Sequence, residues 1–232
     1  MHVLKRLASL VAFALLVVAA IVAPASSTRG NNVDPANFVR TIDNPWYPLR
    51  PGTTYVFTGV SDGKRTRDVV VVTRRVKKVQ GVECVVVKDN VYEDGKLSEA
   101  TDDWFAQDKQ GTVWYFGEAT STVNEAGKIT STKGSWESGV DGAQAGIVMP
   151  AHPKVGQSFR QEYYKGKAED HFAIESLSAR AGTPYVSSRH AMRTREWSPL
   201  EPGTVERKLY VRGVGLVADL ADNLLLVSVR RS

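Results

Sequence analysis

Several residue types that often reveal a protein's chemistry are scarce in this chain. Its 232 residues include one cysteine and four histidines. The single cysteine, Cys84, excludes an internal disulfide, and its place among alternating valines predicts a buried thiol. No two histidines have the spacing of a metal site, so we expect no metal ion and no cofactor. A G-x-S-x-G string at residues 59–63 lies between two expected strands, where a hydrolase elbow cannot form, so it is a chance match.

Long apolar runs are also absent, except near the N-terminus. Residues 7–22 are apolar but fewer than the ~20 residues that a membrane-spanning helix needs. They follow Lys5 and Arg6 and precede the small-residue sequence Ala23-Pro24-Ala25. This pattern predicts a signal peptide over residues 1–25, cleavage after Ala25 and a secreted or periplasmic protein that meets the membrane only during export. An uncleaved membrane anchor is the alternative.

The charge of the chain is nearly balanced. Its 30 Lys and Arg residues and 25 Asp and Glu residues give a formal net charge of +5. This excess is too small to indicate a nucleic-acid partner. The basic clusters at residues 65–67 and 74–78 fit the solvated side of a strand. We therefore expect no nucleic acid among the partners of this protein.

Helical periodicity is almost absent, whereas strand signals recur along the chain. Alternating, β-branched runs are separated by turn sequences such as Asp94-Gly95 and Lys165-Gly166, which are strong local signals of a β-hairpin. A glycine-rich break over residues 139–146 interrupts the series. The expected strands are residues 53–60, 65–79, 82–93, 96–107, 112–123, 128–136, 158–164, 167–178, 186–197, 204–211, 215–220 and 224–230. Consecutive hairpins predict an all-β protein, an antiparallel up-and-down meander curled into a barrel or half-barrel.

The prolines indicate how the chain is divided. Pro35, Pro45, Pro48 and Pro51 oppose a regular helix or central strand. We therefore expect an extended leading segment over residues 26–51 and a single antiparallel β domain over residues 52–232. A curled sheet of this size has a concave face that its side chains need not fill, and this links the fold to ligand binding.

Several short motifs carry a resemblance to known proteins. They are PGTTY (residues 51–55), WFAQD (104–108), VWYFGE (113–118), GSWE (134–137), RQEYY (160–164) and GVGLV (213–217). Together they resemble a family of secreted bacterial β-rich proteins of unassigned function, over most of the chain after the signal peptide. The architecture is similar to that of curled-sheet periplasmic lipoprotein carriers. The resemblance implies a fold but no activity.

The turn at residues 108–111 predicts a facing pair of carboxylates. An Asp first and a Gly fourth favour a type I turn closed by a glycine bulge. Counting back from this turn places Asp102 opposite Glu118, which should repel each other unless they share a proton, bind a cation or point to solvent. The residues that this register places on one face are Asp102, Trp104, Trp114, Phe116 and Glu118.

The hairpin at Lys165-Gly166 predicts a second lined face. A two-residue loop sets Phe159 opposite Phe172, Gln161 opposite Asp170 and Tyr163 opposite Ala168. The apolar face then carries Phe159, Gln161, Tyr163, Asp170, Phe172 and Ile174, and the outer face carries Arg160, Glu162, Glu169 and His171. Polar groups on an apolar face either have an internal partner or form part of a ligand site.

These patterns predict a non-catalytic binding protein that holds a small, partly apolar or lipid-like ligand in the concave face of a curled sheet. Aromatic residues of the two hairpins would supply contact area, and their carboxylates and Gln161 would orient the ligand. A first alternative is a carboxylate-dependent hydrolase, acting for example on glycosides, with Asp102 and Glu118 as acid and base. A second alternative is an envelope interaction protein without a pocket.

Overall fold

The computed structural model describes residues 33–61 and 63–232, so the expected signal peptide and its cleavage after Ala25 lie outside this part of the chain. Here the chain forms strands and one short 3₁₀ turn, η2 (Pro35–Asn37), and no helix is long and apolar enough to cross a membrane. The strands are β1 (Phe38–Val39), β2 (Thr53–Ser61), β3 (Lys64–Val79), β4 (Val82–Glu93), β5 (Lys96–Asp108), β6 (Val113–Val123), β7 (Ile129–Ser131), β8 (Trp136–Glu137), β9 (Gln144–Met149), β10 (Ser158–Arg160), β11 (Glu162–Tyr163), β12 (His171–Gly182), β13 (Ser187–Trp197), β14 (Glu206–Val211), β15 (Gly215–Asp219) and β16 (Leu224–Arg231).

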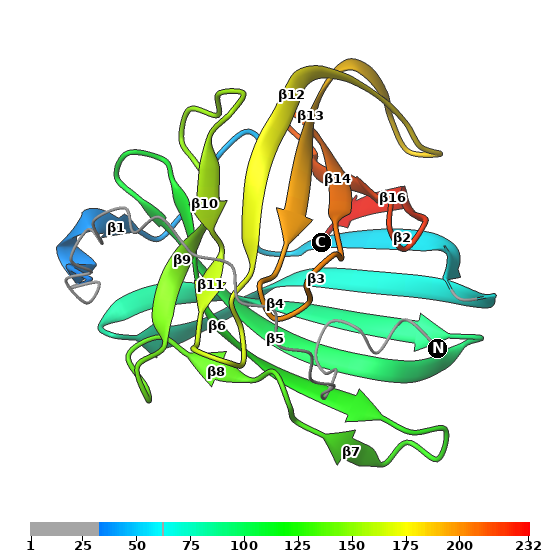
Figure 1. Ribbon diagram of the computed structural model, residues 1–232, viewed down its shortest axis with the longest axis horizontal. Helices are drawn as coiled ribbons and strands as arrows, with labels where there is room; N and C mark the ends of the chain where they lie inside the picture. Colours follow the sequence, from blue (N-terminus) through cyan, green and yellow to red (C-terminus); the bar gives the residue numbers. More distant parts are fainter. Residues whose placement is uncertain (1–32, 62) are drawn as a thin grey trace, which may run out of the picture.

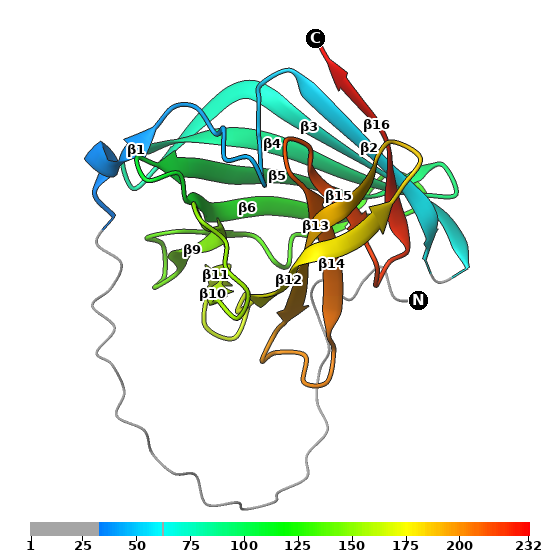
Figure 2. The ribbon, with the colours of Figure 1, turned by 90° about the horizontal axis from the view of Figure 1, so that it is seen from above.

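The strands form an antiparallel sheet that curls into a nearly closed barrel (Figure 1), which confirms the expected fold class. Thirteen strands follow the hydrogen-bonded order β10-β12-β13-β14-β15-β16-β2-β3-β4-β5-β6-β9-β11, and β1, β7 and β8 attach to β5 or β6 outside this path. The long strands β3 to β6 form one wall, and β12 to β14 form another across the barrel (Figure 2). Within β2–β6 and β12–β16, each strand pairs with the next, as a meander requires.

Tight turns set the registers of the long hairpins. In the turns at residues 80–81 and 94–95 both central residues have positive φ angles, 46° and 83° in the first and 47° and 82° in the second. Type I′ hairpin turns require this conformation. In the β5–β6 turn the Asp108 amide donates to the Thr112 carbonyl at 2.9 Å, and Gly111 has a φ of 95°. The expected turn closed by a glycine is therefore confirmed.

The expected register between β5 and β6 holds near this turn and fails beyond it. Ala106 faces Trp114, as expected. Further along the strands, however, Glu118 faces Asp103 and not Asp102. The expected facing pair of Asp102 and Glu118 is therefore wrong.

The cause is an extra residue in β6. Between the register pairs on either side, β6 has one residue more than β5, and Gly117 lies at this point with a φ of 130°. Trp104 consequently lies opposite two residues, Phe116 and Gly117, so the expected one-to-one pairing of Trp104 with Phe116 is also wrong. Such a β-bulge turns every following side chain of the strand to the opposite face.

The two edges of the sheet meet in one continuous segment of the chain, where β10 and β11 follow each other. Only Gln161 separates β10 from β11, yet β10 pairs with β12 and β11 pairs with β9. At this crossing Gly146 approaches the chain so closely that a Cβ atom would lie 2.3 Å from the backbone of Gln161. The strand expected over residues 158–164 is thus divided, and the barrel retains one unsealed seam.

The leading segment packs on both sides of the barrel wall. On the inside, the ring of Tyr47 lies 5.7 Å from that of Phe105 in β5 and 6.3 Å from that of Tyr210 in β14. On the outside, Val33 and Phe38 cover an apolar layer that includes Cys84. Cys84 has no exposed surface, and burial raises the pKa of its thiol to about 12, which confirms the expected buried cysteine.

Two parts of the meander differ from the sequence prediction. Two short strands, β7 and β8, replace the strand expected over residues 128–136, and both pair with β6. The glycine-rich break expected over residues 139–146 ends early, because β9 begins at Gln144 and also pairs with β6. Pairing with a neighbouring strand outweighs the weak local signal in this region.

Candidate functional site

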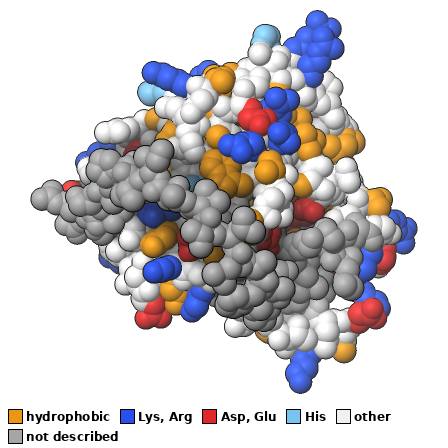
Figure 3. All heavy atoms as spheres, viewed as in Figure 1, with side chains coloured by type: hydrophobic (Ala, Val, Ile, Leu, Met, Phe, Trp, Pro, Cys, Tyr) orange, Lys and Arg blue, Asp and Glu red, His pale blue; other side chains and the backbone are white. Residues whose placement is uncertain are grey.

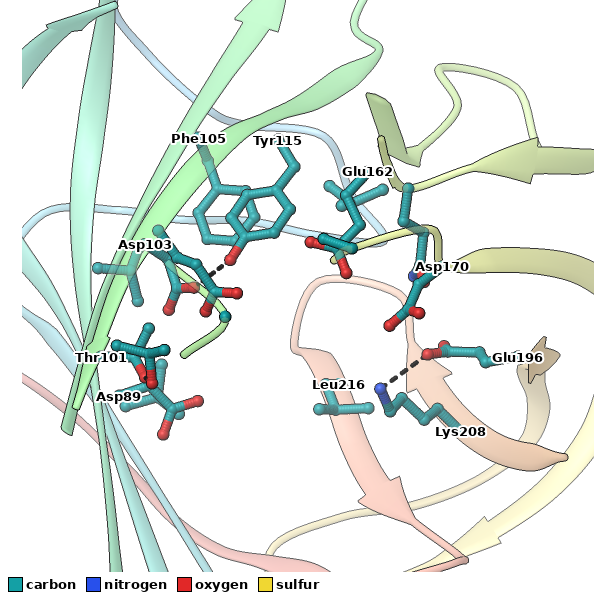
Figure 4. A pocket seen from close by; sticks show the side chains of 18 of the residues that line it. Asp89, Thr101, Asp103, Phe105, Tyr115, Glu162, Asp170, Glu196, Lys208 and Leu216 are labelled. Carbon is teal, nitrogen blue, oxygen red and sulfur yellow. Dashed lines mark hydrogen bonds and ion pairs between the residues drawn. The ribbon is translucent and has the colours of Figure 1, made fainter. Parts of the chain in front are cut away.

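A cavity of about 650 Å³ lies inside the barrel. Its lining comes from the leading segment, from β2 to β6, from residues 161–170 and from β13 to β15. Figure 4 shows side chains from opposite walls that converge on this space. The volume lies within the range of about 300–1,000 Å³ that is typical of small-molecule sites.

Aromatic rings form a large part of the apolar lining. Phe105 and Tyr115 stack with their ring centroids 4.7 Å apart, and Tyr47 reaches from Phe105 to Tyr210. Burial raises the pKa of the hydroxyl groups of Tyr47, Tyr115 and Tyr210, so these groups are protonated donors at neutral pH. The lining therefore combines broad apolar faces with hydroxyl donors.

Carboxylates on the β4–β6 wall lie beside these rings. The Tyr115 hydroxyl donates to Asp103 at 2.6 Å, and Glu118 faces Asp103 across the strand pair. On β4, Asp89 pairs in register with Thr101 of β5. Asp89 and Asp103 both point into the cavity in Figure 4. This wall can therefore present fixed negative charge to a ligand that lies on the aromatic rings.

Glu162 and Asp170 form a second acidic group, which Figure 4 shows across the cavity from Asp103. Their carboxyl groups hydrogen-bond to each other, and Trp136 Nε1 donates to Glu162 Oε2 at 2.8 Å. Burial raises the pKa of Glu162 well above its usual range, and the negative charge of Asp170 raises it further. Burial and the neighbouring carboxylate therefore both favour the protonated form of Glu162.

Lys208 enters the cavity from β14 and is bound by carboxylates. Its Nζ lies 2.7 Å from Glu196 Oε2 and 3.9 Å from Asp219 Oδ2. The other lysines in the described lining, Lys133 and Lys167, are exposed. The interior of the barrel therefore already accommodates one ammonium group between two acidic side chains.

Three of the predicted binding residues line the cavity, namely Glu118, Gln161 and Asp170. Phe172 does not, because it is only 1% exposed and belongs to the main core of the barrel. Tyr163 also lies outside the lining, and its ring packs 4.2 Å from the guanidinium of a neighbouring arginine.

The other four predicted binding residues lie on the outer face of the wall. Trp104, Trp114 and Phe116 pack in the apolar layer that the leading segment covers. Asp102 forms an ion pair with Arg75 at 2.6 Å. This part of the sheet is buried on both faces, so an apolar face does not by itself identify the concave side. The structure thus corrects the expected place of these four residues.

The chain around residue 161 departs from the expected register in one further respect. Tyr164 bridges to Ala168, where Tyr163 was the expected partner. At Gln161 the chain passes from one edge strand of the sheet, β10, to the other, β11. The alternation of inward-facing and outward-facing side chains therefore restarts there. Glu162, expected on the outer face, therefore lines the cavity.

Sequence reasoning missed eight of the ten acidic residues that line the cavity. Three of the eight are Asp89, Asp103 and Glu162. For two of them a signal was available. Strand alternation places Asp89 on the face of Val87 and Asp103 on the face of Phe105, so a carboxylate recurs two positions from a buried apolar residue. Glu162 had no such signal, because the break in the strand precedes it.

Replacing Glu162 with Gln should stabilise the folded protein at neutral pH. The amide keeps an acceptor for Trp136 Nε1 and removes the ionisable group. Because the folded protein raises the pKa of Glu162, its contribution to stability is complete below the unfolded pKa of about 4.3 and is lost as the pH rises through the folded pKa. The variant should therefore gain on the order of 1–3 kcal/mol in urea unfolding at neutral pH, and the gain should vanish near pH 4.

Glu125 provides the control for this experiment. It is an exposed glutamate whose pKa is lowered by a hydrogen bond from Lys96. Glu125→Gln should leave the free energy of unfolding, and its dependence on pH, nearly unchanged. Equal pH profiles for the two variants would contradict the raised pKa of Glu162.

No protein-family model, no curated protein and no solved structure matches this chain. The resemblance to secreted bacterial β-rich proteins therefore stays a prediction, and the functional argument depends on the cavity and its chemistry.

Proposed function

We propose that this protein is a secreted or periplasmic binding protein that holds a small, partly apolar ligand inside the barrel and does not transform it. The observation that supports this most strongly is the cavity of about 650 Å³, which neither the core nor the leading segment fills. A barrel interior of this kind serves as ligand space when the strands enclose more room than their side chains occupy. Aromatic faces would provide contact area, and the fixed polar groups would orient the ligand.

The two ends of the cavity differ in a way that suits a carrier. Tyr47 packs between opposite walls at one end, where it lies against Phe105 and Tyr210. The lining also includes Ser198, Leu200, Glu201 and Thr204 of the β13–β14 loop, and Leu200 and Thr204 are exposed. A ligand would therefore enter beside this loop, with its apolar part toward the tyrosines.

A carboxylate-dependent hydrolase is the second candidate. The observation that favours it is the raised pKa of Glu162 beside Asp170, because a general acid needs such a shift. The pair expected from the sequence cannot serve, since Asp102 is paired with Arg75 on the outer face and Glu118 lines the cavity. Turnover of a nitrophenyl glycoside that Glu162→Gln abolishes would establish this activity. The cavity gives no support to an interaction protein without a pocket.

The binding function predicts that filling the cavity removes ligand affinity. Leu216 of β15 lines the cavity and faces its interior in Figure 4. The unmodified protein should bind the neutral fluorescent probe N-phenylnaphthylamine saturably, and Leu216→Trp should weaken this binding by about tenfold or more, which corresponds to about 1.4 kcal/mol. Probe fluorescence measures the affinity, and circular dichroism checks that the variant is folded.

Val76→Trp is the matched control, because Val76 is 60% exposed and is not among the residues that line the cavity. It adds the same ring without entering the cavity, so the affinity for the probe should not change. The proposed function would be wrong if the unmodified protein did not bind the probe, or if both tryptophan variants bound it as well as the unmodified protein does.

A further inference from the structure

The acidic residues of this protein are concentrated inside the barrel. Ten of its 25 Asp and Glu residues line the cavity, compared with three of its 30 Lys and Arg residues. The whole chain nevertheless carries a formal net charge of +5. Figure 3 shows lysine and arginine side chains spread over one outer face of the molecule. The cavity therefore has the opposite charge to the surface that surrounds it.

Half of these acidic residues lie on the adjacent strands β3 to β6. Asp103 directly faces Glu118, and Asp89 lies on the neighbouring strand, opposite Thr101. Like charges that face each other destabilise a sheet, and diagonal neighbours are still only about 7–8 Å apart. None of the lysines in the described lining lies on these strands. A low-dielectric cleft lined in this way concentrates positively charged ligands.

Asp89 adds an independent observation. Its Oδ1 atom is inaccessible to solvent, and no group in the described part of the chain donates a hydrogen bond to it. A buried carboxylate oxygen without a donor is unfavourable. Asp89 as a whole is only partly buried and points into the cavity in Figure 4, so a cation beside its carboxylate would offset the cost of that buried oxygen electrostatically.

The rest of the lining suits an ammonium group with an apolar substituent. The stacked rings of Phe105 and Tyr115 lie between Asp103 and Glu162 in Figure 4. An ammonium group is attracted both to a carboxylate and to the face of an aromatic ring. Lys208, held between Glu196 and Asp219, shows that the interior accepts such a group.

A metal ion does not fit this arrangement. In residues 33–61 and 63–232, no three His, Cys, Asp or Glu side chains come close enough together to hold one. The carboxylates are instead distributed over two walls of the cavity (Figure 4). A ligand that neutralises both walls must carry its positive charges apart from each other.

We propose that the ligand of the barrel is an alkyl diamine or polyamine. One ammonium group binds between Asp89 and Asp103, the methylene chain crosses the rings of Phe105 and Tyr115, and a second ammonium group binds at Asp170 and Glu162. This assignment rests on the proposed binding function and specifies the chemistry of its ligand.

Calorimetric titration with three probes of equal length tests the assignment. The probes are α,ω-diaminooctane, the neutral α,ω-octanediol and the dianion suberate. The diamine should bind at least about tenfold more tightly than the diol, suberate should not bind, and raised ionic strength should weaken only the diamine. Binding of the diamine should also release protons, because a cation beside Glu162 favours its ionised form.

Two adjacent residues provide matched variants. Asp103→Asn removes a charge inside the cavity and leaves an oxygen that can accept from Tyr115, whereas Asp102→Asn removes a charge on the outer face. The first variant should weaken diamine binding by about tenfold and should weaken the binding of uncharged N-phenylnaphthylamine much less. The second should change neither. Asp89→Asn should behave like Asp103→Asn.

The outcomes separate the ligand assignment from the proposed function. Equal affinity for the diamine and the diol, or equal effects of Asp103→Asn and Asp102→Asn, would overturn the assignment as an amine site. The proposed function would survive that result if N-phenylnaphthylamine still bound. Absence of binding for both the diamine and N-phenylnaphthylamine would overturn both proposals.

Discussion

Replacing Gly117 with Ala should lower the free energy of unfolding by about 2–6 kcal/mol. Gly117 has a φ of 130°, and a Cβ atom there would lie 2.3 Å from the carbonyl oxygen of Trp136. A strained backbone costs about 1–3 kcal/mol, and forcing an extra carbon into a packed site costs about 1–3 kcal/mol more. Denaturant unfolding followed by tryptophan fluorescence measures the loss.

Gly127→Ala separates the effect of the close contact from that of the positive φ. Gly127 has a φ of 77°, but nothing lies within 4 Å of a Cβ atom built there. This control should lose only about 1 kcal/mol, the conformational part of the cost. If Gly117→Ala were no more destabilising than Gly127→Ala, the β-bulge would not depend on the glycine at this position.

A second large effect is expected for Phe116→Ala, at about 3–5 kcal/mol. Phe116 has no exposed surface and lies in the outer apolar layer, where its ring centroid lies 5.4 Å from that of Phe38 in an edge-to-face arrangement. Since Phe116 does not line the cavity, the affinity of the remaining folded protein for N-phenylnaphthylamine should not change. If the alanine variant does not fold, Phe116→Leu should show the same pattern with a smaller loss.

Phe38→Ala completes a double-mutant cycle for this contact. Phe38 lies in the leading segment and is only partly buried, so its loss should be smaller than that of Phe116→Ala. The coupling between the two rings should be about 0.5–1.5 kcal/mol, as for other aromatic pairs. A coupling near zero would mean that the leading segment does not stabilise the barrel through this layer. A loss of probe affinity in folded Phe116→Ala would mean that Phe116 contributes to the ligand site after all.

The hairpins could be predicted because their turn residues act locally. Asp94-Gly95 and the turn after Asp108 fix their own backbone angles, and the register next to the latter turn was therefore correct at Ala106 and Trp114. The register failed a few residues further on, because Gly117 forms a bulge against the β8 chain. That contact is made with a segment distant from the turn, and turn chemistry carries no information about it.

The candidate site was harder to predict than the fold, for a different reason. Around Trp104 and Phe116 the sheet has apolar side chains on both faces, and the direction in which the sheet curls decides which face is outside. Gln161 and Asp170 were identified because they interrupt an apolar pattern. Glu162 was placed on the wrong face, since the crossing of the chain at the seam cannot be recognised from alternation alone.

The seam also bears on how wide the barrel can be. A fully closed barrel has a fixed circumference, because widening it requires a register shift along whole ladders of backbone hydrogen bonds. Here a side-chain hydrogen bond from Arg160 to Gln144, at 2.8 Å, spans the gap between the two ends of the sheet. Opening such a bond costs about 1 kcal/mol, far less than a ladder. The width of the ring is thus least constrained at Gln161, where the chain itself and a side-chain hydrogen bond join the two ends of the sheet, beside Glu162.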